Sequence, residues 1–499
     1  MRKIIRPLCL AATLLFFFLG VELAAVLHWT TERFETANLE LIITYMVLPI
    51  GTVDPQYIYS LVSYLALGFL ATAWLGLFLV RRGGGSAKPR PFPWRPLALP
   101  AAFLVFSGSL FAWEARYRVW ENLFPDAGYY SYVEDNFHLP DPGGIVFPER
   151  KNNLILLILE SVETTMNDEA VFKPKLMPRL EKFYGENLSF GGYRLTTGTQ
   201  TSILSFFSTN LGMPFLGYKF GFFRWDPARD GLELEALTLG RTENKKKHDF
   251  RDRSLLGIME KNGYHLEVIR AASIQFADYD KLIAMSTDRC GIYDFDYFHS
   301  RRPDCPEKMN NWGVDDSYLY ARARERLLAV QKLGKPFFQI IQTVNTHPPG
   351  FYEKNLPAKY GDYRDSFEQA DLMAGEFLEW IGKQTFAGST TVIVVGDHNL
   401  SARGVGAIRI PLPENREIMN FFINPRREPE RGVRRLYAAW DLAPTILEAV
   451  GAEIPGRRLG LGTSLFSGRD TLLERDGLDK YEEMIKKRSR LYEQYYYWW

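Results

Sequence analysis

An uninterrupted run of β-branched residues, Thr391 to Val395, ends at Gly396 and is followed at once by Asp397 and His398. A run without alternation is typical of a parallel strand that is buried on both faces. Functional groups in open α/β sheets lie beyond the carboxyl ends of the strands. An adjacent carboxylate and imidazole at that place could hold a metal ion. The alternative is a turn in which Asp397 caps a helix and His398 is only exposed.

Similar apolar runs recur along the chain and alternate with helical patterns. We predict further strands over residues 153–159, 264–269 and 336–343. Helices are predicted over residues 176–184, 252–262, 318–333, 365–383 and 440–450. This alternation indicates an α/β sandwich with a largely parallel central sheet, over residues 151–470. Residues 471–499 are left as a C-terminal tail.

Four of the predicted strand ends carry polar groups that could bind a metal ion or take part in catalysis. They are Glu160, a hydroxyl cluster of Thr199, Thr201 and Ser202, His347, and the pair Asp397 and His398. Carboxylate and imidazole groups are suitable ligands for manganese, magnesium or zinc, and a hydroxyl beside the ion would become a better nucleophile. Each residue alone has a simpler explanation, because a strand-end Glu often caps a helix or forms a salt bridge. Their conjunction favours one site.

The N-terminal region, residues 1–113, reads as a membrane anchor. Residues 7–25, 57–80 and 97–113 are apolar and long enough to cross the hydrocarbon core, which needs about 20 residues in a helix. A cleaved signal peptide is the alternative for the first segment. Residues 41–53 are shorter, contain Pro49 and favour an interfacial or re-entrant piece. Residues 114–150 form a connector to the predicted domain.

Positive charges predict the orientation of this anchor. Basic residues precede the first apolar segment and fill the loop of residues 81–95. The loop of residues 28–56 contains a single lysine or arginine, Arg33. The positive-inside rule therefore places the N-terminus in the cytoplasm and the large domain outside. Cys290 and Cys305 could form one disulfide there, or remain two free thiols. The formal net charge of +1 gives no argument for a nucleic-acid partner.

The order of these motifs resembles the membrane-anchored phosphoglycerol transferases of the alkaline phosphatase/sulfatase superfamily, which include lipoteichoic acid synthase and the enzyme that modifies periplasmic glucans. The resemblance covers about residues 150–470. The similar segments are NLILLILESVE at 153–163, GTQTSILS at 198–205 with GMP at 212–214, the segment 263–278, NTHPP at 345–349, GDHN at 396–399, WDLAPTIL at 440–447 and LGLGTSLF at 459–466.

This resemblance implies a metal-dependent transferase of the bacterial cytoplasmic membrane, with its catalytic domain on the periplasmic or extracellular side. Phosphatidylglycerol would be the donor and a glycan or polyol phosphate the acceptor, with diacylglycerol released after a covalent phosphoenzyme step. One divalent ion, manganese first and magnesium or zinc as alternatives, would be held by Glu160, Asp397, His398 and the nucleophile. His347 would bind the phosphoglycerol oxygen or protonate the leaving group, and Asp278 and Arg403 are further substrate-binding candidates.

The nucleophile itself remains open between two neighbouring residues. The family nucleophile is a threonine, which favours Thr201, whereas the spacing from Gly212-Met-Pro214 favours Ser202. Two other functions also remain open: phosphoethanolamine transfer by the same fold, and a non-catalytic membrane-tethered binding domain. A sulfatase activity is disfavoured, because the chain lacks the Cys-x-Pro-x-Arg or Ser-x-Pro-x-Arg sequence that generates its aldehyde nucleophile.

Overall fold

The computed structural model describes residues 2–33, 55–81, 95–120, 128–139, 143–216, 224–225, 232–233, 249–302, 305, 312–400, 412–413 and 415–495. Two compact units share the chain, with the boundary between Asp126 and Ala127. The segment 41–53 and Arg403, which were named above, lie outside the described residues.

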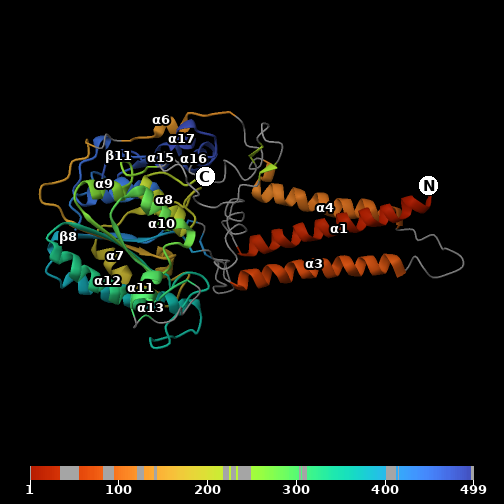
Figure 1. The fold of residues 1–499 in the computed structure, drawn as a ribbon, viewed down its shortest axis with the longest axis horizontal. Helices are drawn as coiled ribbons and strands as arrows, with labels where there is room; N and C mark the ends of the chain where they lie inside the picture. Colours follow the sequence, from red (N-terminus) through yellow and green to blue (C-terminus); the bar gives the residue numbers. More distant parts are fainter. Residues whose placement is uncertain are drawn as a thin grey trace. The chain divides into compact units, whose positions relative to one another are not determined.

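The described part of the first unit contains three long helices: α1 (Arg2–Arg33), α3 (Pro55–Arg81) and α4 (Arg95–Tyr117) (Figure 1). Their segments Leu8–Thr31, Ile58–Leu79 and Leu97–Tyr117 are long and apolar enough to cross a membrane. Polar groups between the helices pair with each other. Trp113 Nε1 donates to the Leu23 carbonyl at 2.7 Å, and the Tyr117 hydroxyl donates to Thr30 Oγ1 at 2.8 Å. The three expected apolar helices are confirmed, and they fit a membrane-anchored protein.

The second unit is built on a six-stranded sheet with the order β6-β5-β7-β1-β8-β9. Its strands are β1 (Asn153–Leu159), β5 (His265–Arg270), β6 (Cys290–Tyr293), β7 (Phe337–Gln342), β8 (Thr390–Gly396) and β9 (Asn420–Ile423). Every neighbouring pair is parallel except β8 and β9. The expectation of a largely parallel sheet is therefore confirmed, with an antiparallel edge strand that the sequence analysis did not include.

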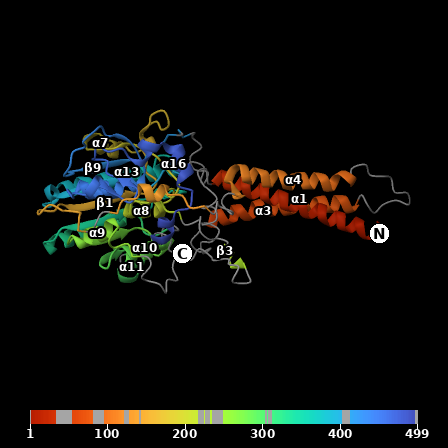
Figure 2. The same cartoon turned by 90° about the horizontal axis from the view of Figure 1, so that it is seen from above.

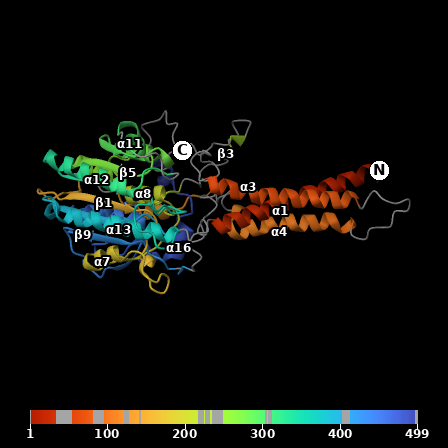
Figure 3. The same ribbon diagram turned by 90° about the horizontal axis from the view of Figure 1, so that it is seen from below.

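Helices cover both faces of this sheet. Successive side chains of a strand point to opposite faces, so each face has its own apolar core. Leu154, Leu156 and Ile158 of β1 belong to one apolar core, and Ile155, Leu157 and Leu159 belong to the other. The first core also contains residues of α8 (Ser202–Leu211), α9 (Leu255–Lys261), α10 (Tyr279–Ser286) and α14 (Leu442–Ala449). The second contains residues of α7 (Pro178–Glu186), α11 (Phe295–Arg301), α12 (Asp316–Val330) and α13 (Tyr363–Gly382) (Figures 2 and 3).

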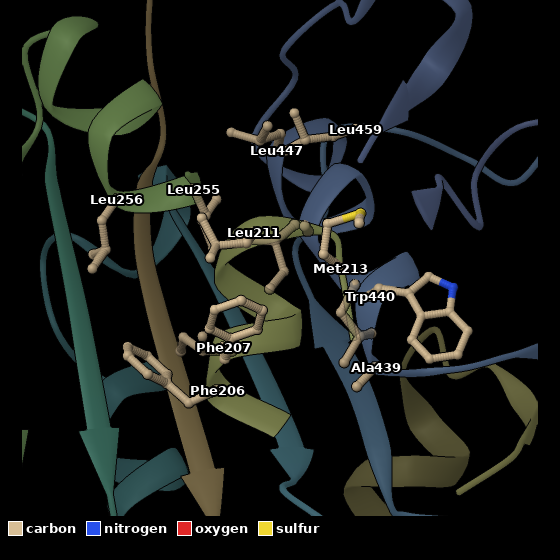
Figure 4. Packing of buried hydrophobic residues seen from close by; sticks show 14 of the residues in the cluster. Phe206, Phe207, Leu211, Met213, Leu255, Leu256, Ala439, Trp440, Leu447 and Leu459 are labelled. Atoms are coloured by element: carbon tan, nitrogen blue, oxygen red, sulfur yellow. The ribbon is translucent and has the colours of Figure 1, made fainter. Parts of the chain in front are cut away.

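Helix α8 lies deep in the first core. Phe206, Phe207 and Leu211 pack beside Leu255 of α9, and Met213 just beyond the helix lies near Trp440 (Figure 4). All six side chains are buried. This packing explains why the apolar segment after Thr201 folds as a helix, and it fixes the direction of the α8 axis.

Small elements from several parts of the chain complete the second unit. Two-stranded sheets are formed by β2 (Gly191–Tyr193) with β10 (Arg434–Tyr437), by β11 (Arg458–Leu459) with β12 (Gly462–Thr463) and by β3 (Arg224–Trp225) with β4 (Leu232–Glu233). Short helices are α6 (Tyr132–Asn136), α15 (Leu472–Asp476), α16 (Leu478–Met484) and α17 (Arg490–Tyr495). Residues 471–495 thus fold as part of this unit. Cys290 and Cys305 are not joined by a disulfide in the described structure.

Candidate metal and nucleophile site

The carboxyl ends of β1 and β8 bring Glu160, Asp397 and His398 together. The strands pair in register up to Leu159 and Gly396, so the next residues of both leave the sheet at the same edge. Gly396 permits the close approach, because a Cβ at this position would collide with the Val162 carbonyl oxygen. One ligand atom from each of the three side chains lies within 4.8 Å of the other two. Sequence and strand register therefore place a three-residue cluster at one point.

Ser161 connects the two carboxylates of this cluster. Its backbone N–H donates to Asp397 Oδ1 at 2.8 Å, and its hydroxyl donates to Glu160 Oε1 at 2.8 Å. To do so, Ser161 adopts a φ of 54°, in the left-handed region that a serine rarely occupies. The sequence analysis did not assign Ser161 a role, and an apolar run ending in Glu-Ser carries no signal for it.

The orientation of the His398 ring suits metal binding. Nδ1 lies 2.9 Å from the carbonyl oxygen of Asn399, an acceptor, so Nδ1 carries a hydrogen and Nε2 is the ligand atom. Nε2 lies 3.4 Å from Glu160 Oε1 and 3.6 Å from Asp397 Oδ2. Burial opposes protonation of the ring, but the two carboxylates outweigh it and raise the pKa of His398.

The cluster contains more negative charge than the surrounding chain neutralises. Burial, followed by the charge of Glu160, raises the pKa of Asp397 to about 7. Asp397 Oδ2 is buried and accepts no hydrogen bond from any group in the described part of the chain. Two carboxylates and one imidazole are a donor set for a divalent cation. These residues fit one metal ion, as the sequence predicts.

Ser202 is the hydroxyl that reaches this cluster. Its Oγ donates to Glu160 Oε2 at 2.9 Å and lies 3.4 Å from His398 Nε2. Ser202 is the first residue of α8, where free backbone N–H groups and the helix dipole favour negative charge. Thr201 is the N-cap residue, and its side chain makes no capping hydrogen bond. Of the two candidate nucleophiles, the structure thus places Ser202 against the cluster.

Arg270 lies in the segment 263–278 but was not among the predicted site residues. It ends β5, opposite Gln342 of β7, and is 4% exposed. Its guanidinium lies 3.8 Å above the Tyr279 ring, and Nη1 donates to the Ser273 carbonyl at 2.7 Å, whereas Nε is buried without a hydrogen-bond partner among the described residues. Burial lowers the pKa of Arg270, and Tyr279, Glu160 and Asp397 partly offset the decrease.

His347 and Asp278, the other expected site residues in the described part of the chain, have contacts of their own. His347 follows Thr346, whose hydroxyl donates to the Glu160 carbonyl at 2.5 Å. The His347 ring packs on Trp312 with centroids 4.1 Å apart, and its Nδ1 lies 3.0 Å from the Pro348 carbonyl. Asp278 forms an ion pair with Lys281 at 2.7 Å.

The Sulfatase family model matches residues 152–452, which is more than half of the chain, so the protein belongs to the sulfatase family. This match spans Glu160, Ser202, Asp397 and His398. The fold agrees with this family assignment, as the resemblance implied.

Among curated proteins, the chain is similar to "Phosphoglycerol transferase I" of Xanthomonas campestris pv. campestris, with 24% identity over 328 residues, 64% of this chain and 43% of that protein. It is 26% identical to the Escherichia coli protein of the same name over 353 residues, 69% of this chain and 42% of that protein. The chain thus spans less than half the length of these relatives. An alkaline phosphatase superfamily protein of Vibrio parahaemolyticus superposes with a TM-score of 0.49 at 19% identity, covering 71% of this chain and 77% of that one.

Proposed function

We propose that this protein is a metal-dependent phosphoglycerol transferase. It takes phosphoglycerol from phosphatidylglycerol, forms a covalent phosphoserine at Ser202, releases diacylglycerol and passes the phosphoglycerol to a glycan or polyol-phosphate hydroxyl. The similarity to phosphoglycerol transferases supports this choice of transferred group. The charge bias of the N-terminal loops supports a catalytic unit on the periplasmic or extracellular side of a bacterial cytoplasmic membrane.

One observation carries the proposal: the Ser202 hydroxyl is hydrogen-bonded to Glu160 inside a cluster that also contains Asp397 and His398. A serine alcohol is a weak nucleophile unless a neighbouring base or a metal ion activates it. Here Glu160 accepts a hydrogen bond from the hydroxyl, and Asp397 and His398 complete the metal-ligating cluster beside it. It also starts a ten-residue helix whose free N–H groups face incoming negative charge.

The first step makes one bond and breaks one. Ser202 Oγ attacks the phosphorus of the lipid phosphodiester, and its proton passes to Glu160 Oε2, the atom that already accepts it. The bond from phosphorus to the diacylglycerol oxygen breaks, and the leaving oxygen takes a proton, for which we assign His347 as donor. In the second step an acceptor hydroxyl attacks the phosphorus of the phosphoserine and gives its proton to His347, the bond from phosphorus to Ser202 Oγ breaks, and Glu160 returns the proton to Ser202.

Two further groups bind the phosphoryl oxygens in this scheme. Arg270 offers an Nε–H donor that has no acceptor among the described residues, and the first turn of α8 offers backbone N–H groups. A manganese ion, or magnesium or zinc in its place, bound by Glu160, Asp397 and His398 would lower the pKa of the serine hydroxyl and offset charge on the phosphoryl oxygens. No nucleotide is needed, because the lipid phosphodiester already contains the bond that is exchanged.

The experiment that tests this function measures diacylglycerol release from labelled phosphatidylglycerol by the detergent-solubilised full chain. Manganese, magnesium and zinc are supplied separately. Release with at least one ion, and transfer of labelled glycerol phosphate to the protein, would support the proposal. Release from phosphatidylethanolamine instead would identify a phosphoethanolamine transferase. No release from either lipid with any of these ions would leave the non-catalytic binding domain as the better explanation.

A further inference from the structure

We infer that Glu482 is a positioning residue for Ser202, and that the C-terminal segment, residues 478–495, holds in place the segment that carries the nucleophile. This inference rests on the proposed function for its catalytic consequence. Residues 196–216, which contain α8, are called the Ser202 segment below. Neither Glu482 nor any other residue of the C-terminal segment contacts the metal-ligating cluster among the contacts of the described residues, so the effect is on geometry.

Glu482 holds the beginning of the Ser202 segment. Its Oε1 accepts the backbone N–H of Thr197 at 2.8 Å, and its Oε2 accepts the Thr197 hydroxyl at 2.5 Å. Thr197 is 5% exposed. Removal of the carboxylate would leave a buried N–H and a buried hydroxyl without their acceptors, which is unfavourable because both groups have already lost their contact with water. Both groups, which lie five residues before the nucleophile, are then expected to shift toward other hydrogen-bond acceptors.

Tyr492 holds the other end of the same segment. Its hydroxyl donates to the Pro214 carbonyl at 2.9 Å and accepts the backbone N–H of Leu216 at 2.8 Å. The two ends are also tied to each other, because Phe215 N–H donates to the Gly198 carbonyl at 3.1 Å. Gly198 has a φ of +84°, and a Cβ there would collide with Phe215. Glu482 and Tyr492 thus bind neighbouring points of one closed loop.

The C-terminal segment is rigid enough to transmit this constraint. Tyr481, beside Glu482, is fully buried and stacks on Trp440 with ring centroids 4.8 Å apart. Near Tyr492, Glu134 Oε1 accepts both the Ser489 hydroxyl at 2.9 Å and the Leu491 backbone N–H at 3.0 Å. Glu134 of α6 therefore fixes the C-terminal segment, and the C-terminal segment fixes the Ser202 segment.

Position matters here because the Ser202 oxygen must reach phosphorus while it remains at Glu160. A displacement of about 1 Å from a mutation outside the site can cost about a hundredfold in rate. Glu482→Ala should therefore lower kcat about ten- to a hundredfold. Its KM for the lipid should change less than its kcat, because the α8 N–H groups move with Ser202 but Arg270 keeps its position. Glu482→Gln, which keeps an oxygen acceptor of the same length, should retain at least about half of kcat.

The experiment uses the detergent-solubilised full chain with manganese. It measures kcat and KM for diacylglycerol release together with hydrogen exchange of peptides from residues 196–216. Glu483→Ala is the matched control, because Glu483 is the adjacent residue of α16 and is exposed. We expect faster exchange at residues 196–201 in Glu482→Ala, unchanged exchange in the central strands, and wild-type behaviour of Glu483→Ala. Tyr492→Phe should reproduce the effect at residues 212–216.

Three results would overturn the inference: wild-type kcat and exchange in Glu482→Ala, an equal loss in Glu482→Gln, or faster exchange throughout the unit, which would indicate general destabilisation. If the wild-type chain releases diacylglycerol from neither lipid, the proposed function fails by itself. The exchange measurement then still decides whether Glu482 holds the Ser202 segment.

Discussion

The Ser202 hydroxyl lies 2.9 Å from Glu160 Oε2, although 42 residues separate the two in sequence. Ser202→Ala should therefore abolish phosphoenzyme formation and lower diacylglycerol release at least about a thousandfold, because the attacking oxygen is gone. Thr201→Ala should keep release within about tenfold of wild type, since the N-cap side chain makes no capping bond. Labelled lipid and mass spectrometry of the Ser202 peptide are the measurements. Loss in Thr201→Ala with retention in Ser202→Ala would reverse the assignment.

This pair also shows how far sequence alone could go. The strand of residues 153–159 was predicted with its observed bounds, because a long apolar run that ends at polar residues is compatible with few structures other than a buried strand. The choice between Thr201 and Ser202 could not be made in the same way. It depends on where α8 begins, and that boundary is set by the packing of Phe206 and Leu211 in the core.

Other site features were beyond sequence reasoning for similar reasons. Ser161 acquires its role from a left-handed backbone conformation, and Arg270 from the alignment of β5 with β7. The edge strand Asn420–Ile423 is only four residues long and pairs antiparallel. The contact between Glu482 and Thr197 joins residues 285 apart, for which a single sequence contains no signal.

The buried guanidinium of Arg270 should be sensitive even to lysine. Arg270→Lys keeps a positive charge but loses the planar group that stacks on Tyr279 and the Nε–H donor. We expect kcat/KM for the lipid donor to fall about ten- to a hundredfold, the range of a charged hydrogen bond. The matched control is Arg434→Lys, whose side chain is 79% exposed. Equal kcat/KM in the two variants would remove Arg270 from the phosphate-binding groups.

The cluster should hold one divalent ion for each chain. Asp397→Asn removes the charge of a carboxylate whose Oδ2 accepts no hydrogen bond from the described residues, so manganese affinity should fall by more than about a hundredfold. Chelation of wild type with EDTA should stop diacylglycerol release, and added manganese should restore it. Metal content by mass spectrometry is the measurement, with Asp278→Asn as the control. A stoichiometric ion that survives in Asp397→Asn would place the metal elsewhere.

Gly396 should be intolerant of a side chain. A Cβ at this position would collide with the Val162 carbonyl, so Gly396→Ala should lower the free energy of unfolding by about 1–3 kcal/mol and displace Asp397. In Gly388→Ala nothing lies within 4 Å of the added Cβ, and the change should stay within about 0.5 kcal/mol. Thermal unfolding of the solubilised proteins provides the comparison. Equal stability of the two variants would show that the β1 and β8 ends can separate freely.

Asp371 should make the stability of the second unit depend on pH. Its carboxylate accepts the N–H groups of Arg179 at 3.0 Å and Leu180 at 2.7 Å in the first turn of α7, yet burial raises its pKa to about 6 from 3.8. The folded state therefore holds more protons than the unfolded state between these two values, and stability is lost as the pH rises through this window.

Asn does not titrate and keeps an oxygen acceptor. The stability of Asp371→Asn relative to wild type should consequently increase by about 3 kcal/mol from pH 4 to pH 7. Thermal unfolding at pH 4, 5, 6 and 7 measures the difference, and Asp479→Asn, at an exposed aspartate, should show a constant one. A pH-independent difference for Asp371→Asn would mean that the two N–H groups hold this carboxylate ionised throughout the range.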